Sequence, residues 1–171
     1  GGLKPVAVRP EQPIQPLLVS LDGEATTRVA PGEVLRVLAP GAERGLLLLG
    51  TAEVAARREG DELVLSVPWD LPAGLGLLRV EGSGVRGEAE VALDPQRPLV
   101  LFRAQPTRPS AGGRVRLEVV PRLRLREVRV EGSALVRGED GVWRGEVPVG
   151  PGQPGQVVTL SGQALTEEGR I

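Results

Sequence analysis

A period of two in the placement of apolar residues constrains the fold of this chain more than any other feature. In residues 113–120 (GRVRLEVV), apolar and charged residues alternate: Val115, Leu117 and Val119 against Arg114, Arg116 and Glu118. Residues 61–67 and 84–93 alternate in the same way. Such alternation is typical of antiparallel strands with one buried and one solvated face. Turn-forming clusters recur about every eight to twelve residues, which predicts a β-sandwich or barrel. Helical signals are nearly absent: residues 51–60 (TAEVAARREG) have the composition for about two helical turns, but they lie between predicted strands and end in a hairpin-turn signal.

The order of these predicted elements occurs twice along the chain. The first copy, residues 30–93, contains APGEVLRVLAP, LLLLG, EGDELVLSVP, LPAGLGLLRVEGSG and GEAEVAL. The second copy, residues 109–164, contains PSAGGRVRLEVVP, REVRVEG, EDGVWRGEVP and GQPGQVVTLSGQA. A shared order at similar spacing favours an internal duplication. The alternative is that two unrelated β-domains share the same turn chemistry.

We therefore predict three segments. Residues 1–13 are a Pro-rich lead-in with an extended, polyproline-like conformation that becomes an edge strand. Residues 14–95 form a first β-sandwich domain, and residues 98–171 form a second one. The joint between them, LDPQRP at residues 93–98, contains two prolines, which leave little slack and predict a semi-rigid connection.

The composition indicates a folded and heat-stable chain. Gly and Pro contribute 24 and 16 of the 171 residues, but 40% of the chain is hydrophobic, which is more than disorder allows. Cys, Met and Asn are absent, so we expect a thermophilic bacterial source. No run approaches the ~20 apolar residues of a membrane helix. Because Met is absent, we expect that an upstream segment of the translated protein has been removed.

Two all-β units in tandem, with these turns at matching places, resemble bacterial immunoglobulin-like or fibronectin type III-like modules. The matching residues are Pro31-Gly32-Glu33-Val34 and Gly112-Gly113-Arg114-Val115 early in the units, and Val67-Pro68 and Val147-Pro148 later. Cys and Tyr are absent, so the antibody-type disulfide core and tyrosine corner are missing and the strand topology stays open. The resemblance covers residues 14–171. It implies two tandem antiparallel immunoglobulin-like sandwiches in the periplasm or at the cell surface, as spacers, adhesin stalks or accessory domains of secreted enzymes.

The residue types that most enzymes need are missing. Without His and Cys, neither a Ser-His-Asp nor a Cys-His site can form, and zinc lacks its usual ligands. Acidic clusters at residues 22–24, 59–62 and 138–140 lie beside Gly, and we interpret them as turn residues rather than calcium ligands. We predict no catalysis, no cofactor and no metal. The alternative, a hydrolase with paired carboxylates, requires two such groups that converge in a pocket.

Three aromatic residues are too few for a sugar-binding platform or for stacking nucleic-acid bases. Trp143 alternates in phase with Val147, which predicts that it lies in the core. Phe102 is a second candidate for burial. Trp69 follows a Val-Pro pair where a strand enters a loop, so its ring is expected either to pack in the core or to be partly exposed.

Positive charge is concentrated in the second half of the chain. Residues 97–171 carry 12 basic and 8 acidic residues, against 9 and 14 in residues 1–96. The candidate anion-binding or partner-binding face consists of six arginines: Arg114, Arg116, Arg122, Arg124, Arg126 and Arg129. Arg122 and Arg124 alternate with leucines and are expected to share a solvent face. If that segment pairs with the strand of Arg114, one basic sheet face results.

Three interpretations of this charge remain open. In the first, the face is simply solvated, and Glu118, Glu127 and Glu131 are partners of the arginines. In the second, the face binds an anionic polymer such as envelope polysaccharide or phospholipid headgroups. In the third, the acidic first domain attracts the basic second domain, within one chain or between copies.

These features favour a non-catalytic structural spacer or interaction segment of an exported, cell-envelope-associated protein. The alternative is a recognition module that binds an anionic envelope polymer or a partner protein through the basic face, including an accessory module of a secreted enzyme. Nucleic acid is not expected as a partner, and the extracytoplasmic location follows from the module type alone.

Overall fold

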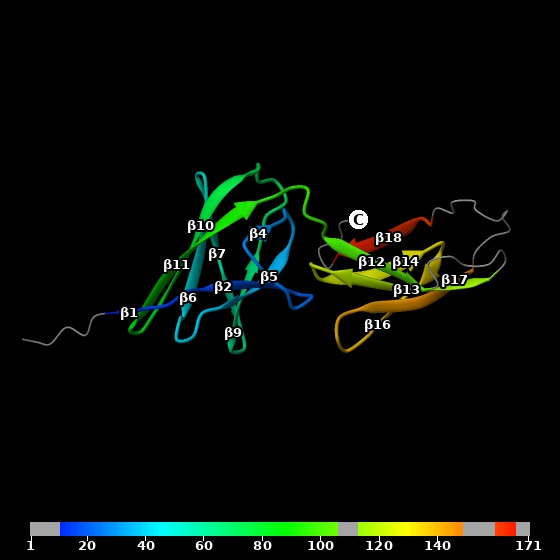
Figure 1. Cartoon of the computed structure of the whole chain (residues 1–171), viewed down its shortest axis with the longest axis horizontal. Helices are drawn as coiled ribbons and strands as arrows, with labels where there is room; N and C mark the ends of the chain where they lie inside the picture. Colours follow the sequence, from blue (N-terminus) through cyan, green and yellow to red (C-terminus); the bar gives the residue numbers. More distant parts are fainter. Residues whose placement is uncertain (1–10, 106–112, 149–159, 167–171) are drawn as a thin grey trace, which may run out of the picture. The chain divides into compact units, whose positions relative to one another are not determined.

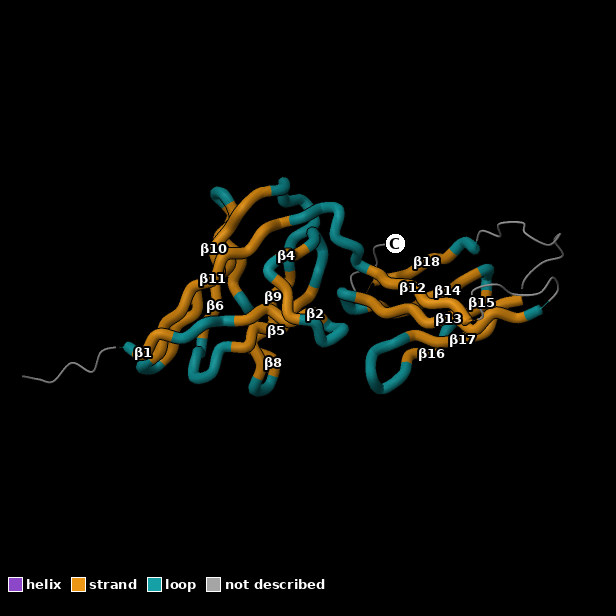
Figure 2. The backbone as a smooth tube through the Cα atoms, in the orientation of Figure 1, coloured by secondary structure: helices purple, strands orange, loops and turns teal. Residues whose placement is uncertain are grey.

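The computed structural model describes residues 11–105, 113–148 and 160–166, which consist of strands, turns and loops (Figures 1 and 2). Within these ranges no helix is long and apolar enough to cross a membrane. The chain divides into two compact units, Gly1–Arg97 and Pro98–Ile171, called unit 1 and unit 2 below. Each unit contains two sheets. The predicted fold class is confirmed as far as the described residues are all-β and their four sheets, mostly antiparallel, fit two tandem β-sandwich domains.

Unit 1 consists of a six-stranded and a five-stranded sheet. The first has the order β1-β11-β10-β6-β7, and β4 also pairs with β11. Its strands are β1 (Gln12–Pro13), β4 (Arg28–Val29), β6 (Arg44–Leu49), β7 (Ala52–Ala55), β10 (Gly74–Gly82) and β11 (Val85–Leu93). The second has the order β3-β2-β5-β9-β8. Its strands are β2 (Leu17–Ser20), β3 (Ala25–Thr26), β5 (Val34–Leu38), β8 (Arg57–Glu59) and β9 (Glu62–Ser66).

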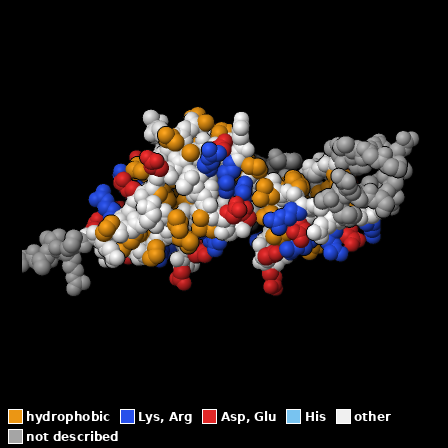
Figure 3. Space-filling view, in the orientation of Figure 1, with side chains coloured by type: hydrophobic (Ala, Val, Ile, Leu, Met, Phe, Trp, Pro, Cys, Tyr) orange, Lys and Arg blue, Asp and Glu red, His pale blue; other side chains and the backbone are white. Residues whose placement is uncertain are grey.

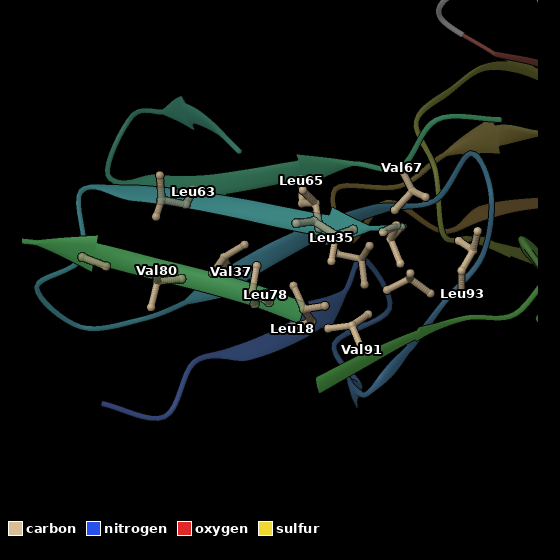
Figure 4. Close-up of a cluster of buried hydrophobic side chains, with 14 residues drawn as sticks. Leu18, Leu35, Val37, Leu63, Leu65, Val67, Leu78, Val80, Val91 and Leu93 are labelled. Carbon is tan, nitrogen blue, oxygen red and sulfur yellow. The ribbon is translucent and has the colours of Figure 1, made fainter. Parts of the chain in front are cut away.

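The core of unit 1 lies between these two sheets (Figure 4). Leu35 on β5 pairs with Leu65 on β9, and Leu47 on β6 pairs with Leu78 on β10. All four side chains are fully buried. Burial of one leucine side chain contributes about 1.5–3 kcal/mol, so these pairs hold the two sheets together.

Residues 51–60, the one segment with helix-forming composition, form strands: β7 pairs with β6 and β8 pairs with β9. Strand pairing here overrides the helical propensity of Ala, Glu and Arg. Of the lead-in, residues 1–10 lie outside the described residues, and β1 is an edge strand parallel to β11, as expected.

Unit 2 repeats the strand order of unit 1. One sheet has the order β12-β13-β17-β16, which matches β2-β5-β9-β8, and the other has the order β18-β14-β15, which matches β10-β6-β7. The strands are β12 (Val100–Gln105), β13 (Arg114–Pro121), β14 (Leu125–Val130), β15 (Ser133–Ala134), β16 (Val136–Arg137), β17 (Trp143–Pro148) and β18 (Gly162–Thr166). The alternation predicted in residues 113–120 is confirmed, since Val115, Leu117 and Val119 are buried.

Candidate functional site

The six arginines of the candidate face do not share one sheet. They lie on two strands and on the loop between them: Arg114 and Arg116 on β13, Arg126 and Arg129 on β14, Arg122 and Arg124 in the loop. Strands β13 and β14 belong to different sheets of unit 2. The pairing that would have made one basic sheet face does not occur, so that expectation is wrong.

Arg122 is a structural residue and not part of a solvent face. The residue as a whole is only 6% exposed. Its Nη1 donates a hydrogen bond to the backbone oxygen of Pro98 at 2.9 Å. Its backbone N–H donates to the oxygen of Leu99 at 2.7 Å. Arg124 is half-buried. The expected shared solvent face of Arg122 and Arg124 is wrong because the chain bends after Pro121 instead of continuing as a strand.

The outward face of the β12-β13-β17-β16 sheet gathers a different set of charges. Arg103, Glu118 and Arg144 are cross-strand neighbours on β12, β13 and β17. The Nε of Arg144 lies 3.3 Å from Oε1 of Glu118. In the adjacent row, Arg116 lies opposite Glu146. Arg103 and Arg144 were not among the predicted site residues, although Arg144 follows the core residue Trp143 and so alternates onto the outer face of the strand.

Most of these charges are locally compensated, as the first of the three interpretations expects. Arg144 binds Asp140 with its Nη2 2.7 Å from Oδ2, and this hydrogen bond holds the pKa of Asp140 below its usual value. Arg129 pairs with Glu127. Glu131, in contrast, accepts a hydrogen bond from the backbone N–H of Ser161. Figure 3 shows basic and acidic side chains interspersed on this view of unit 2. Exposed pairs of this kind contribute little to stability.

Some exposed arginines of unit 2 lack such compensation. Within the described residues, no ion pair or hydrogen bond of the side chain is found for Arg103, Arg116 or Arg126. Arg126 is the extra residue at a β-bulge, where the register of β14 against β18 shifts between Leu125 and Glu127. Arg103 and Arg116 lie on neighbouring strands of one sheet. Arg116 and Arg126 are therefore the part of the candidate face that is available to an anion, and Arg103 lies outside the candidate face as it was predicted.

A buried carboxylate in unit 1, that of Glu33, is held by several hydrogen bonds. The segment Ala30-Pro31-Gly32-Glu33 forms a turn in which the N–H of Glu33 donates to the oxygen of Ala30 at 3.1 Å. Gly32 has a φ of 83°, which a type II turn requires at this position and which Gly adopts without strain. The turn directs Glu33 inward, where it is 0% exposed.

The Glu33 carboxylate accepts hydrogen bonds from three residues. Arg97 donates from Nε to Oε1 at 2.9 Å and from Nη2 to Oε2 at 3.3 Å. The N–H of Ala30 donates to Oε1 at 3.0 Å, and the hydroxyl of Ser20 donates to Oε2 at 3.3 Å. Arg97 also donates to Oγ of Ser20 at 2.7 Å. The charge is therefore paired and saturated, as a buried carboxylate requires.

This cluster was not predicted from the sequence, where Glu33 belongs to an opening turn and Arg97 to the joint. The two residues are 64 positions apart, and no periodic pattern connects them. The cluster holds the end of unit 1 in place, because Arg97 is the last residue of that unit.

The three aromatic residues have three different environments. Trp143 is 7% exposed, which confirms the core assignment. The half-buried ring of Trp69 lies over Gly32, where an added Cβ would be only 2.7 Å from ring carbons. Phe102 is 63% exposed, so the expectation of burial is wrong. Its strand β12 is at the edge of its sheet.

The acidic clusters belong to turns, as predicted. Oδ1 of Asp22 accepts the N–H of Glu24, and Oδ1 of Asp140 accepts the N–H of Val142, both at 3.1 Å. Gly60, between β8 and β9, has a φ of 60°. In the part of the chain that the structure describes, no three acidic side chains are grouped so that they could hold a metal ion.

No family model matches this chain, and no curated protein matches it. One similar solved structure is the Bacteroides ovatus mixed-linkage glucan utilization locus SGBP-B in complex with a mixed-linkage heptasaccharide. It has 14% identity and a TM-score of 0.38 and covers 84% of this chain and 38% of that one. A mutant of Salmonella alpha-2-macroglobulin has 15% identity and a TM-score of 0.33 and covers 94% of this chain and 15% of that one. The chain thus spans well under half of either protein.

Proposed function

We propose that this chain is a non-catalytic structural spacer or interaction segment of an exported, cell-envelope-associated protein. Its role is to present and separate other parts of that protein, without covalent chemistry and without a cofactor. The observation that carries the proposal is the way each unit fixes its own side of the joint.

On the side of unit 1, the joint is bonded residue by residue. The N–H of Asp94 donates to the oxygen of Val29 at 2.8 Å, and Oδ1 of Asp94 accepts the N–H of Gln96 at 3.0 Å. Arg97 is then held by the buried carboxylate of Glu33. A charge-assisted, bidentate contact of this kind is stronger and more directional than a neutral hydrogen bond.

On the side of unit 2, hydrogen bonds hold the chain from its first residue, Pro98. Pro98 and Leu99 both accept hydrogen bonds from Arg122, one from its side chain and one from its backbone. No residue therefore stands between the last anchored residue of unit 1 and the first of unit 2. A connection without free residues lacks the flexibility of an ordinary linker, which suits a spacer.

The experiment is a distance measurement between spin labels. Because the chain contains no Cys, Glu53→Cys and Glu139→Cys place one unique label on an exposed residue of each unit. We expect a narrow distance distribution by double electron–electron resonance. A matched control with four Gly-Ser residues inserted after Arg97 should give a broad one. If the unmodified chain is as broad as this control, the joint is not stiff and the proposal fails.

The second candidate function is recognition of an anionic envelope polymer by unit 2. Exposed Arg103 and Arg116, which lack carboxylate partners among the described residues, favour it. We expect Arg103→Gln with Arg116→Gln to weaken retention on anionic vesicles or isolated envelope fractions, and retention to fall steeply with salt. The control pair, Arg44→Gln with Arg57→Gln, removes exposed arginines of unit 1 that already have partners. If the two variant pairs are retained equally, recognition by Arg103 and Arg116 is refuted and the spacer proposal remains.

A further inference from the structure

The outer face of the six-stranded sheet in unit 1 is apolar where a solvated face is expected to be polar. Leu47 and Leu49 on β6 and Leu78 on β10 are buried in the core. Because side chains alternate between the two faces of a strand, the residues next to them lie outward. Those outward residues include four leucines, called the leucine face below: Leu46, Leu48, Leu75 and Leu77. Leu75 is 82% exposed, and the other three are half-buried.

The register of the sheet places two of these leucines side by side, with an acidic residue on each side of them. Leu48 on β6 lies opposite Leu77 on β10. Leu48 also lies opposite Glu53 on β7, and Leu77 also lies opposite Glu90 on β11. This row therefore crosses four neighbouring strands and has a carboxylate at each end. Since neighbouring strands are about 4.8 Å apart, the backbones of the two acidic residues are about 14 Å apart.

The two carboxylates at the ends of this row have no partners. Glu53 and Glu90 are exposed, and within the described residues neither side chain has an ion pair or a hydrogen bond. Glu88, on the same face of β11, is instead bound to Arg79, with its Oε1 3.0 Å from Nε. The apolar row is therefore bordered by two negative charges that can pair with cations of another molecule.

Unit 2 shows that the fold does not require this apolar face. Its β14 is the counterpart of β6, and both strands end in a two-residue turn to the next strand. Aligned on these turns, Leu46 and Leu48 correspond to Glu127 and Arg129, which form an ion pair. Charged residues at these positions are what a solvated sheet face requires. The leucines are therefore particular to unit 1, and an exposed apolar face that is bordered by charges is typical of an interaction surface.

The chain itself carries a complementary surface on unit 2. On the outward face of the β12-β13-β17-β16 sheet, Arg103 and Arg116 are exposed, and their side chains have no partner in the described part of the chain. Val136 lies in the same cross-strand row as Arg103 and is 72% exposed. This face thus offers two cations and an exposed apolar side chain, where the leucine face offers two carboxylates and exposed apolar side chains.

We propose that the leucine face of unit 1 binds the outward face of the β12-β13-β17-β16 sheet in unit 2 of a second copy of the chain. The leucines supply the apolar centre of this interface, and Glu53 and Glu90 pair at its rim with the two arginines, Arg103 and Arg116. Two leucine faces do not bind each other, because that contact would bring carboxylates of the two copies together. The inference depends on neither of the two functions proposed above.

The test is sedimentation velocity of the intact chain over a range of concentrations, at low and at high salt. We expect self-association that weakens as the salt concentration rises. Leu75→Gln with Leu77→Gln should weaken it at least tenfold. The matched control is Leu17→Gln with Leu38→Gln, which should leave it unchanged. These two leucines are cross-strand neighbours on the other sheet of unit 1 and are 50% and 48% exposed.

Charge reversal tests the surface on unit 2. Glu53→Arg with Glu90→Arg should weaken self-association at least tenfold, and so should Arg103→Glu with Arg116→Glu. A mixture of these two variants should associate again, because each face then meets a face of opposite charge on the other variant. Recovery in the mixture also shows that both variants are folded.

Several results would overturn the proposal. One is the absence of self-association at every concentration up to the solubility limit. Another is equal weakening by the leucine variant and its control. A third is a mixture of the two charge-reversed variants that stays dissociated. A sedimentation coefficient that charge reversal changes equally at every concentration would place the contact within one chain and not between copies.

Discussion

Removal of Arg97 should destabilise unit 1 far more than removal of an exposed arginine. In Arg97→Ala the fully buried Glu33 carboxylate loses two of its four hydrogen bonds, those from Nε and Nη2. Each hydrogen bond to a charged group contributes about 1.5–3 kcal/mol. Breaking a buried ion pair costs about 3–5 kcal/mol, because one charge is left uncompensated. We therefore expect the free energy of unfolding of unit 1 to fall by about 3–5 kcal/mol.

Urea unfolding followed by Trp69 fluorescence measures this loss, since the Trp69 ring lies over Gly32, next to Glu33. A Trp143→Phe background removes the signal of unit 2. With an m-value of about 2 kcal/mol/M, the midpoint should drop by about 1.5–2.5 M. The control is Arg58→Ala, an exposed site where the change should stay within about 0.5 kcal/mol.

A double variant separates the ion pair from general packing. Glu33→Leu with Arg97→Leu removes both charges and leaves neither one unpaired. It should cost much less than the sum of the two single changes, as replacement of buried ion pairs by apolar residues often does. If Arg97→Ala lowers the midpoint no more than Arg58→Ala does, the assigned role of the Glu33 cluster is wrong.

Three further predictions concern single sites. The Arg144 hydrogen bond lowers the pKa of Asp140, so its stabilising effect is present above the unfolded value of about 4 and is lost as the pH falls through the lower folded value. Arg144→Gln should raise the pKa of Asp140 toward its ordinary value in a carboxyl NMR titration, while the hydrogen bond from the N–H of Val142 continues to lower it; an unchanged pKa would contradict this. Gly32→Ala should cost about 1–3 kcal/mol and change Trp69 emission, because φ is 83° and the Cβ would meet the ring. Gly23→Ala, with a φ of 92° but no atom within 4 Å of the Cβ, should cost less and leave the emission unchanged. Trp143→Ala should cost about 3–5 kcal/mol in the calorimetric transition of unit 2 and leave that of unit 1 in place; a shift of both would contradict it.

Local patterns were enough to predict the strands and much of the core. Alternation in residues 113–120 correctly assigned the buried side of β13, and Trp143 followed from the same rule. The acidic turns were also predictable, because Asp and Gly have conformational preferences that act over a few residues. These features depend on neighbours in sequence, which a single chain displays.

The predictions that were wrong or missing concern features that depend on segments distant in the sequence. Strands β13 and β14 are consecutive in sequence but belong to different sheets, so their arginines do not form one face. Arg97 and Glu33 meet across 64 positions. Phe102 shares the inner face of its sheet with Val119 and Trp143, but it lies on the edge strand β12 and is 63% exposed. Residues 51–60 have helix-forming composition and are strands because of their partners.

The central claim is that the joint is stiff, because the chain is hydrogen-bonded within unit 1 up to Arg97 and within unit 2 from Pro98 onward. The most direct measurement is ¹⁵N relaxation, which gives a rotational correlation time for each unit of the intact chain. The account predicts the same correlation time for both units, and separate, shorter values once four Gly-Ser residues are inserted after Arg97. Separate, shorter values in the unmodified chain would contradict it.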